Sequence, residues 1–295
     1  MRQFTRFIAL FAALLFCGAV GAQHVITPQQ LSEYGTKRHL WRDGYTIQPG
    51  VYEISEPIIV DAGVATIGGT LLHTRGKGPD IMAHGVILRP RPDFKGDAAL
   101  KFIGVHPNVY GLHVDARQVA ISYGVVLEAK AVNGSREATG GRGVWTGLTV
   151  EGPFTKAALR FLCAEEMSFY GANIYATGTG NAISLENDVW SQTAVAIHGA
   201  SIYAYGNDAV TCEGWVNDTR IMETFIATPF HAVNATRAAN GTYNNKFDGR
   251  FECGPKSSVI FGGAGKGWSR GTTTLRVSPI VTAFKPQAPV AVPAN

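Results

Sequence analysis

The chain repeats one short pattern several times, and this repetition constrains its fold more than any other feature. Residues 171–187, GANIYATGTGNAISLEN, return in altered form as residues 199–215, GASIYAYGNDAVTCEGW. In each copy an apolar residue follows the first glycine by three places, and a second apolar run opens with alanine ten or eleven places after that glycine. Constant spacing inside a unit indicates a constant turn between two short strands.

Further copies of the unit begin at Gly111 and Gly147, so that the four glycines are separated by 36, 24 and 28 residues. Weaker copies extend the series from Gly68 to Phe284. Two or three short strands cannot bury their apolar side alone, so units of this size must stack. We therefore expect an all-β fold, a single-stranded parallel β-helix of about eight to nine coils with a short N-terminal cap.

A β-sandwich is the rival architecture for such a series of short strands. It would place hairpin turns such as Asn-Gly between the apolar runs. Only Asn133-Gly and Asn240-Gly offer that turn. In the β-helix the alternation within a strand instead decides what faces outward, so that in GLHVD the side chains of Leu112 and Val114 are expected inside.

The first 22 residues have the features of a secretory signal peptide. Basic Arg2 and Arg6 precede an apolar run from Phe7 to Val20, and small residues follow as far as Ala22. The apolar run is short for a membrane span. We therefore expect a secreted or periplasmic protein, cleaved near Ala22, with no membrane span.

Charge and cysteine content exclude several functions. Removal of the signal peptide takes away two basic residues and no acids, which reduces the formal net charge from +4 to about +2. This balance gives no reason to expect binding to nucleic acid or to an anionic membrane. Cys163, Cys212 and Cys253 show no CxxC or Cys/His spacing, so zinc is not expected and at most one disulfide can form. Buried single thiols are the alternative.

Several segments resemble the opening of the pectate-lyase-like (pectin lyase fold) superfamily of right-handed parallel β-helices. They are VYEISEPIIV from Val51, the Gly68-Gly pair, GVILRP from Gly85, and then the repeats. The resemblance is one of pattern and covers residues 45 to about 285. The superfamily includes polysaccharide lyases, polygalacturonase-type hydrolases and phage tailspike depolymerases, so the resemblance implies a right-handed helix and a polysaccharide partner. It divides the chain into a signal peptide (1–22), an N-terminal segment and cap (23–60), a β-helix (61–285) and a Pro/Ala-rich tail (286–295).

Stacked coils place equivalent residues in ladders, one strand spacing apart. Two outward ladders, two and four places after the glycine, combine acids, an amide, hydroxyls and two tyrosines. Such a face suits a sugar polymer, because aromatic rings cover the apolar faces of sugars and polar groups meet their hydroxyls. The alternative is a solvated strand face on which tyrosine serves strand formation. The candidate substrate-binding residues are His113, Asp115, Thr149, Glu151, Asn173, Tyr175, Ser201 and Tyr203.

A third ladder supplies candidate catalytic residues. It holds Glu186 and Glu213, with Leu162 in the coil before them. Carboxyls on adjacent coils could lie about 5 Å apart, the separation of a retaining glycosidase pair. Their like charges would raise the pKa of one of them. The alternative is that both acids turn into water or bind a cation.

Asp208 is a third catalytic candidate, behind the two glutamates. The segment Gly206-Asn-Asp is similar to the Gly-Asp-Asp segment of polygalacturonase-type hydrolases, but Asn207 replaces the first aspartate. The later Gly-His-Gly and Arg-Ile-Lys segments of that family are missing, so its mechanism does not transfer. A side chain at this position typically bonds the backbone of a turn, and we expect that role for Asp208.

The remaining possibilities concern cofactors and the class of function. No metal site or cofactor is expected, although a lyase would use Ca²⁺, for which Asp115, Glu151 and Glu128 could approach one another with Arg117 or Arg160 nearby. Two classes of function stay open. The chain is either an exported protein that cleaves or binds polysaccharide, or a non-enzymatic β-helix scaffold, adhesin or tailspike-like protein, for which a homotrimer is one arrangement.

Overall fold

The computed structural model describes residues 24–26, 45–47, 49–60, 66–68, 85–104, 108–129, 131–132, 135–136, 143–163, 166–187, 194–238, 245–254, 259–261 and 274–277. The expected signal peptide and Pro/Ala-rich tail lie outside these residues. The described residues form strands and no helix, so none of their elements is a helix long and apolar enough to cross a membrane.

Three strands make one coil of the column. A first strand turns at a glycine into a second strand, and a longer turn leads to a third. The first strands are β8 (Asn108–Tyr110), β13 (Gly143–Thr146), β16 (Met167–Tyr170) and β19 (Ala196–His198). The second strands are β9 (Leu112–Asp115), β14 (Thr149–Gly152), β17 (Asn173–Ala176) and β20 (Ser201–Ala204). The third strands are β10 (Tyr123–Glu128), β15 (Ala157–Leu162), β18 (Asn181–Asn187) and β21 (Val210–Gly214).

In the next coil one long strand, β22 (Arg220–Thr228), replaces the first and second strands, and β23 (Val233–Ala238) is the third. Further strands pair above and below. On the C-terminal side they are β24 (Lys246–Cys253), β25 (Val259–Phe261) and β26 (Thr274–Val277). On the N-terminal side they are β1 (His24–Ile26), β2 (Tyr45–Ile47), β3 (Gly50–Ile54), β4 (Ile58–Val60), β5 (Thr66–Gly68), β6 (Val86–Pro90) and β7 (Ala98–Ile103).

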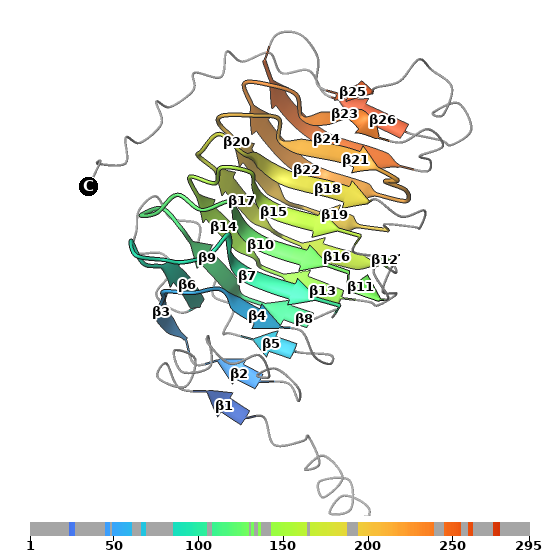
Figure 1. Ribbon diagram of the computed structural model, residues 1–295. Coiled ribbons are helices and arrows are strands. Elements are labelled where there is room, and N and C mark those ends of the chain that lie inside the picture. Colours follow the sequence, from blue (N-terminus) through green and yellow to red (C-terminus); the bar gives the residue numbers. More distant parts are fainter. Residues whose placement is uncertain are drawn as a thin grey trace, which may run out of the picture.

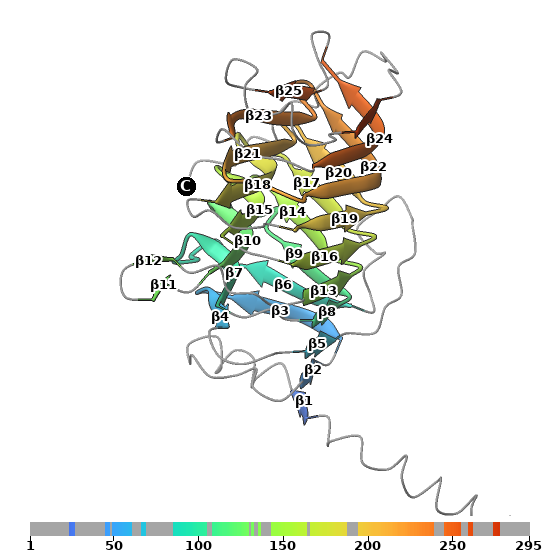
Figure 2. The same ribbon diagram turned by 90° about the vertical axis from the view of Figure 1, so that its right-hand side faces the viewer.

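The strands form two long sheets in which every pairing is parallel (Figures 1 and 2). The third strands and their counterparts make an eight-stranded sheet, and the first and second strands join through β22 into a sixteen-stranded sheet. The short hairpin of β11 (Ala131–Val132) and β12 (Ser135–Arg136) is antiparallel and lies between β10 and β13 in the chain. The chain is therefore a parallel β-helix, as the repeats predict.

The number of coils differs from the prediction. The sequence predicts eight to nine coils. In the described part of the chain, five consecutive coils, from β8 to β23, are complete in strands and side chains. The strands beyond them continue the pairing as parts of further coils. Residues 45–60, assigned above to the cap, contain β2, β3 and β4, which pair with β5, β6 and β7 in the same manner.

The repeated glycine marks the bend between the first and second strands. Gly111, Gly147, Gly171 and Gly199 have φ angles of 60°, 67°, 64° and 61°, in the left-handed region that glycine enters without steric cost. In β22 the corresponding residue is Glu223, with φ of 53°. Bends of this kind explain why the glycine recurs while the distance between units varies.

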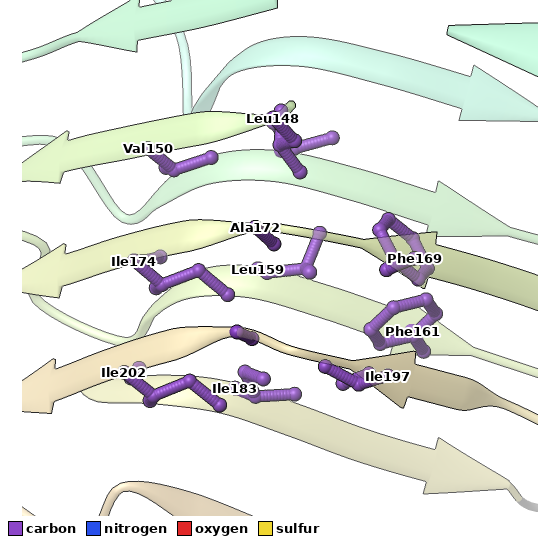
Figure 3. Close-up of a cluster of buried hydrophobic side chains, with 14 of the residues drawn as sticks. Leu148, Val150, Leu159, Phe161, Phe169, Ala172, Ile174, Ile183, Ile197 and Ile202 are labelled. Atoms are coloured by element: carbon purple, nitrogen blue, oxygen red, sulfur yellow. The ribbon is translucent and has the colours of Figure 1, made fainter. Parts of the chain in front are cut away.

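The core is a set of apolar ladders inside the column. Val150, Ile174 and Ile202 occupy equal positions on successive second strands, and all three are fully buried. Leu159 and Ile183 do the same on third strands, facing them (Figure 3). Each coil thereby covers the apolar side chains of its neighbours, which supplies the burial that one unit lacks.

The largest buried side chain, Trp145, packs between Phe102 and Phe169, with ring centroids 5.2 Å and 5.3 Å away. Phe102 comes from a third strand, whereas the other two come from first strands, so the aromatic contacts join opposite walls of the column. Leu112 and Val114 also point inside, as the alternation in GLHVD predicts.

From the left-handed bend we predict opposite changes in the free energy of unfolding for two substitutions. Gly199→Ala should lower the free energy of unfolding by about 1 kcal/mol, because alanine resists the left-handed region, while its added Cβ meets no atom within 4 Å. Glu223→Gly should raise that free energy by about 0.5–1 kcal/mol by removing the same strain. Chemical denaturation measures both changes. Glu223→Ala, which keeps a Cβ, is the control, and a gain as large as that of the glycine variant would contradict the explanation.

Candidate functional site

The predicted ladders lie in register on the outside of the second strands. His113, Thr149, Asn173 and Ser201 pair in that order on β9, β14, β17 and β20. Asp115, Glu151, Tyr175 and Tyr203 form the neighbouring ladder on the same strands. We call these eight side chains the ladder face.

Three members of the ladder face are buried: His113, Asp115 and Thr149. Only 2% of Asp115 is exposed, because two arginines cover it. Arg89 donates from Nε and Nη2 to Oδ2, at 3.1 Å and 2.9 Å, and Arg117 donates from Nε to Oδ1 at 2.8 Å and from Nη2 to Oδ2 at 2.9 Å. These three residues are thus part of the packing at this end of the face.

The arginines also determine the charge of Asp115. Burial by itself would raise the pKa of this carboxyl, but the hydrogen bonds and charge of Arg117, followed by those of Arg89, hold it far below its usual range. The hydrogen bond to Asp115 in turn raises the pKa of Arg117. Asp115 is therefore a permanently ionised partner of two arginines, a state unsuited to proton transfer near neutral pH.

Beside this cluster, His113 and Glu151 are joined by a bond of 2.8 Å between Nε2 and Oε1, and Arg117 lies 3.3 Å from the same oxygen. Glu151 is therefore shared between a histidine and an arginine. Of the acids considered for Ca²⁺, Asp115 and Glu151 are adjacent in register, and both contact Arg117. Within the described part of the chain no group of three or more His, Cys, Asp or Glu side chains is arranged to hold a metal ion.

The other half of the ladder face is half-exposed and aromatic. The rings of Tyr175 and Tyr203 stack with centroids 4.8 Å apart and planes 10° from parallel. Phe225 of β22 lies next to Tyr203 at 5.5 Å, and the guanidinium of Arg250 lies over Phe225 at 5.7 Å. The stack covers the ring face of Tyr175 that meets Tyr203, and Tyr203 is bordered by Tyr175 on one side and by Phe225 on the other. Less ring face is therefore exposed on these tyrosines than the sequence suggested.

Glu186 and Glu213 are adjacent in register, as predicted, on the outside of β18 and β21. Each has its own cation. Arg160 donates from Nε to both oxygens of Glu186, at 3.0 Å and 3.1 Å, Ser184 Oγ donates to Glu186 at 2.8 Å, and Arg237 lies 3.0 Å from Glu213. Neighbouring carboxyls are thus neutralised by neighbouring arginines.

The predicted rise in the pKa of one carboxyl is wrong for Glu186. Burial does act to raise this pKa, but the hydrogen bonds from Arg160 and Ser184 and the charge of Arg160 outweigh burial and lower it. A general acid must carry a proton near neutral pH. Glu186 is instead the acceptor of a fixed ion pair.

Asp208 lies at the turn between β20 and β21, and its carboxylate bonds the next coil. Oδ1 accepts bonds from the backbone N–H of His231 at 3.0 Å and from its Nδ1 at 2.8 Å, and Oδ2 accepts a bond from Asn234 Nδ2 at 2.6 Å. Asp208 therefore bonds the backbone of a turn, as predicted, but this turn belongs to the following coil. His231 was not among the predicted site residues. The register of the strands could have identified it. Val210 pairs with Val233, and Asp208 and His231 lie two places before these residues.

The three cysteines within the described part of the chain are free thiols. Cys163 and Cys212 are buried and Cys253 is half-buried. Burial raises the pKa of Cys212 to about 12 and that of Cys253 to about 11, so neither thiol ionises near neutral pH. These residues therefore belong to the packing of the column.

Comparison with known proteins shows no family for the chain. No family model matches it, and neither does any curated protein. A solved structure described as ORF18 of Geobacillus virus E2 is similar over 80% of this chain, with 10% sequence identity and a TM-score of 0.42. The similar region covers 59% of that chain.

The cluster at Asp115 predicts a pH-dependent loss of stability. Asp115→Asn should lower the free energy of unfolding at pH 7 by about 2–3 kcal/mol, because two arginines lose a buried carboxylate. The pKa of Asp115 is lower in the folded than in the unfolded chain. The unfolded chain therefore binds more protons in acid, and this stabilisation is full above about pH 5 and falls as the pH drops further.

Urea unfolding of the native protein and the Asp115→Asn variant between pH 7 and pH 3 tests this prediction. The difference between them should shrink toward pH 3. Asp93→Asn is the control, since Asp93 pairs with Arg91 in an exposed position and should contribute little at any pH. A difference that does not change with pH would contradict the assignment to Asp115.

Proposed function

We propose that the protein is an exported β-helix that binds an extended polysaccharide along the exposed part of the ladder face, and that it does not cut the chain with Glu186 and Glu213. One observation carries the proposal. Polar side chains recur in register on two successive coils, where Asn173 lies beside Ser201 and Tyr175 lies beside Tyr203.

A polymer is the ligand that fits such a repeat. Adjacent parallel strands are about 4.8 Å apart, a distance similar to the length of one sugar unit, so one contact can recur as the chain follows the column. Sugar hydroxyls both donate and accept, and the amide of Asn173, the hydroxyl of Ser201 and the phenol of Tyr203 can do the same. Each such bond contributes only about 0.5–1.5 kcal/mol, so affinity depends on several units binding together.

The ion pairs support binding rather than cleavage by the two glutamates. A retaining glycosidase needs one protonated and one ionised carboxyl. Arg160 and Ser184 hold Glu186 in its ionised form, which argues against Glu186 as the protonated partner, and Glu213 forms an exposed ion pair with Arg237. The competing function is a rigid scaffold, adhesin or tailspike-like subunit, in a homotrimer for example. That role uses the same column but gives no reason for the polar repeat.

Removing single hydroxyls from the ladder face should weaken polysaccharide binding. Tyr203→Phe keeps the stack on Tyr175 and removes only the phenol oxygen, so we expect affinity to fall about 2- to 10-fold, with a similar loss for Ser201→Ala. Affinity electrophoresis against neutral and acidic polysaccharides measures the change. Tyr170→Phe is the matched control, because Tyr170 stacks on His198 outside the ladder face.

Two results would overturn the proposal. The first is that the native protein is not retarded by any polysaccharide in the panel, and the second is that Tyr170→Phe weakens binding as much as Tyr203→Phe. The same mixtures should also be assayed for unsaturated ends and for reducing ends. We expect neither product, and loss of either product in Glu186→Gln or Glu213→Gln would show that these residues do cut the polymer.

A further inference from the structure

His231 is held in one orientation by a chain of hydrogen bonds that the proposed binding function does not use. Thr236 donates to Asn234 Oδ1 from its backbone N–H at 3.0 Å and from Oγ1 at 2.7 Å. This fixes the amide of Asn234, whose Nδ2 donates to Asp208, and Asp208 binds the imidazole at 2.8 Å. The ring is thus oriented by Asp208, which is itself oriented by Asn234.

The tautomer of His231 follows from its partners. Asp208 receives bonds from the backbone N–H of His231 and from the amide of Asn234, so its carboxylate acts as an acceptor. Nδ1 of His231 then carries a hydrogen, and in the neutral ring Nε2 keeps a lone pair. The side chain of His231 is 31% exposed, so the ring is accessible to water. An imidazole oriented by a carboxylate through Nδ1 is the arrangement of a general base.

The base lies at the turn that follows the second strands, and those strands carry the ladder face. Asp208 follows Tyr203 by five residues, at the turn that leads from the second strands to the third. Phe230, next to His231 in the chain, is 46% exposed and is the one large apolar side chain among the described residues that is so exposed at these turns. An exposed aromatic side chain on the residue that precedes the base can add an apolar contact to an organic group bound there.

Two types of bond in a polysaccharide can be considered for this base. Cleavage of the glycosidic bond by hydrolysis requires two carboxyls around it, but Asp208 is bonded to His231 and Asn234, and Glu213 is bonded to Arg237. Hydrolysis of an ester requires a base and a water molecule, and one imidazole can both take and return the proton. The arrangement therefore suits the ester.

We propose that His231 is a catalytic general base that removes O-acyl groups, such as acetyl groups, from the bound polysaccharide, with Asp208 as a positioning residue. This proposal rests on the polysaccharide binding proposed above. Nε2 takes a proton from water while the water oxygen bonds to the acyl carbon. The bond between that carbon and the sugar oxygen then breaks, and the sugar oxygen receives the proton from Nε2. The products are a carboxylic acid and a free sugar hydroxyl.

Acetate release from O-acetylated polysaccharides, compared with the same polymers after chemical deacetylation, tests the proposal. The native protein should release acetate only from the acetylated polymers. His231→Gln should reduce the rate at least 100-fold, within the contribution expected of a general base. Asp208→Asn should lower kcat with little change in KM, because it disturbs the tautomer and leaves the binding face intact. His198→Gln, a histidine of the first strands, is the matched control and should keep the native rate.

The outcomes separate the two proposals. Release of acetate with the expected losses in His231→Gln and Asp208→Asn supports the catalytic base. Retention of the polymer without release of acetate, or equal rates in native protein and His231→Gln, overturns the base and leaves polysaccharide binding standing. Acetate release without retention of any polymer overturns only the binding proposal. Circular dichroism and thermal melting of each variant show whether it is folded, and a second substitution, His231→Asn, replaces the first if that variant is not.

Discussion

Register between neighbouring coils is the constraint on which the rest of the structure depends. Each strand pairs in parallel with its counterpart one coil away, so from β8 to β21 a side chain meets the side chain at the same position of the neighbouring unit. Inside the column this favours the stacking of apolar residues such as Ile174 and Ile202. On the outer surface the same register brings like charges together, because an acid on one coil tends to lie beside an acid on the next. The structure compensates with arginines on the flanking coils, since Arg160 pairs with Glu186 and Arg237 pairs with Glu213, while Arg89 and Arg117 bind Asp115.

The same register explains which properties could be predicted from the sequence. The repeats were sufficient to predict a parallel β-helix, the inward position of Val114 and the pairing of Tyr175 with Tyr203, because these follow from counting residues within a unit. The number of coils was predicted less accurately, because the weak copies of the repeat at both ends do not show where complete coils begin. Long β22, which joins two strands without a glycine, also departs from the pattern that the count relies on.

The properties of the site depended on partners that the unit does not contain. Arg160 lies on the coil before Glu186, and nothing in the glutamate ladder indicates that this arginine will lower its pKa. Asp208 and His231 are 23 residues apart and become neighbours only through the pairing of the strands that follow them. The predicted register of the ladders is confirmed, while their role in binding stays a prediction, and the stacking of Tyr175 on Tyr203 reduces the ring face open to a ligand. Fold thus follows from spacing within the unit, whereas chemistry follows from contacts between units.

The β11–β12 hairpin shows how freely the column can be elaborated. It is inserted between β10 and β13, in the longest of the three intervals between repeats, and the strands on both sides still pair without a change of register. The entropy of closing a loop rises only slowly with its length, so an insertion at this edge disturbs neither the core nor the ladder face. Related proteins can therefore gain or lose surface loops one at a time. A peptide can likewise be grafted at this position while the spacing between the coils stays the same.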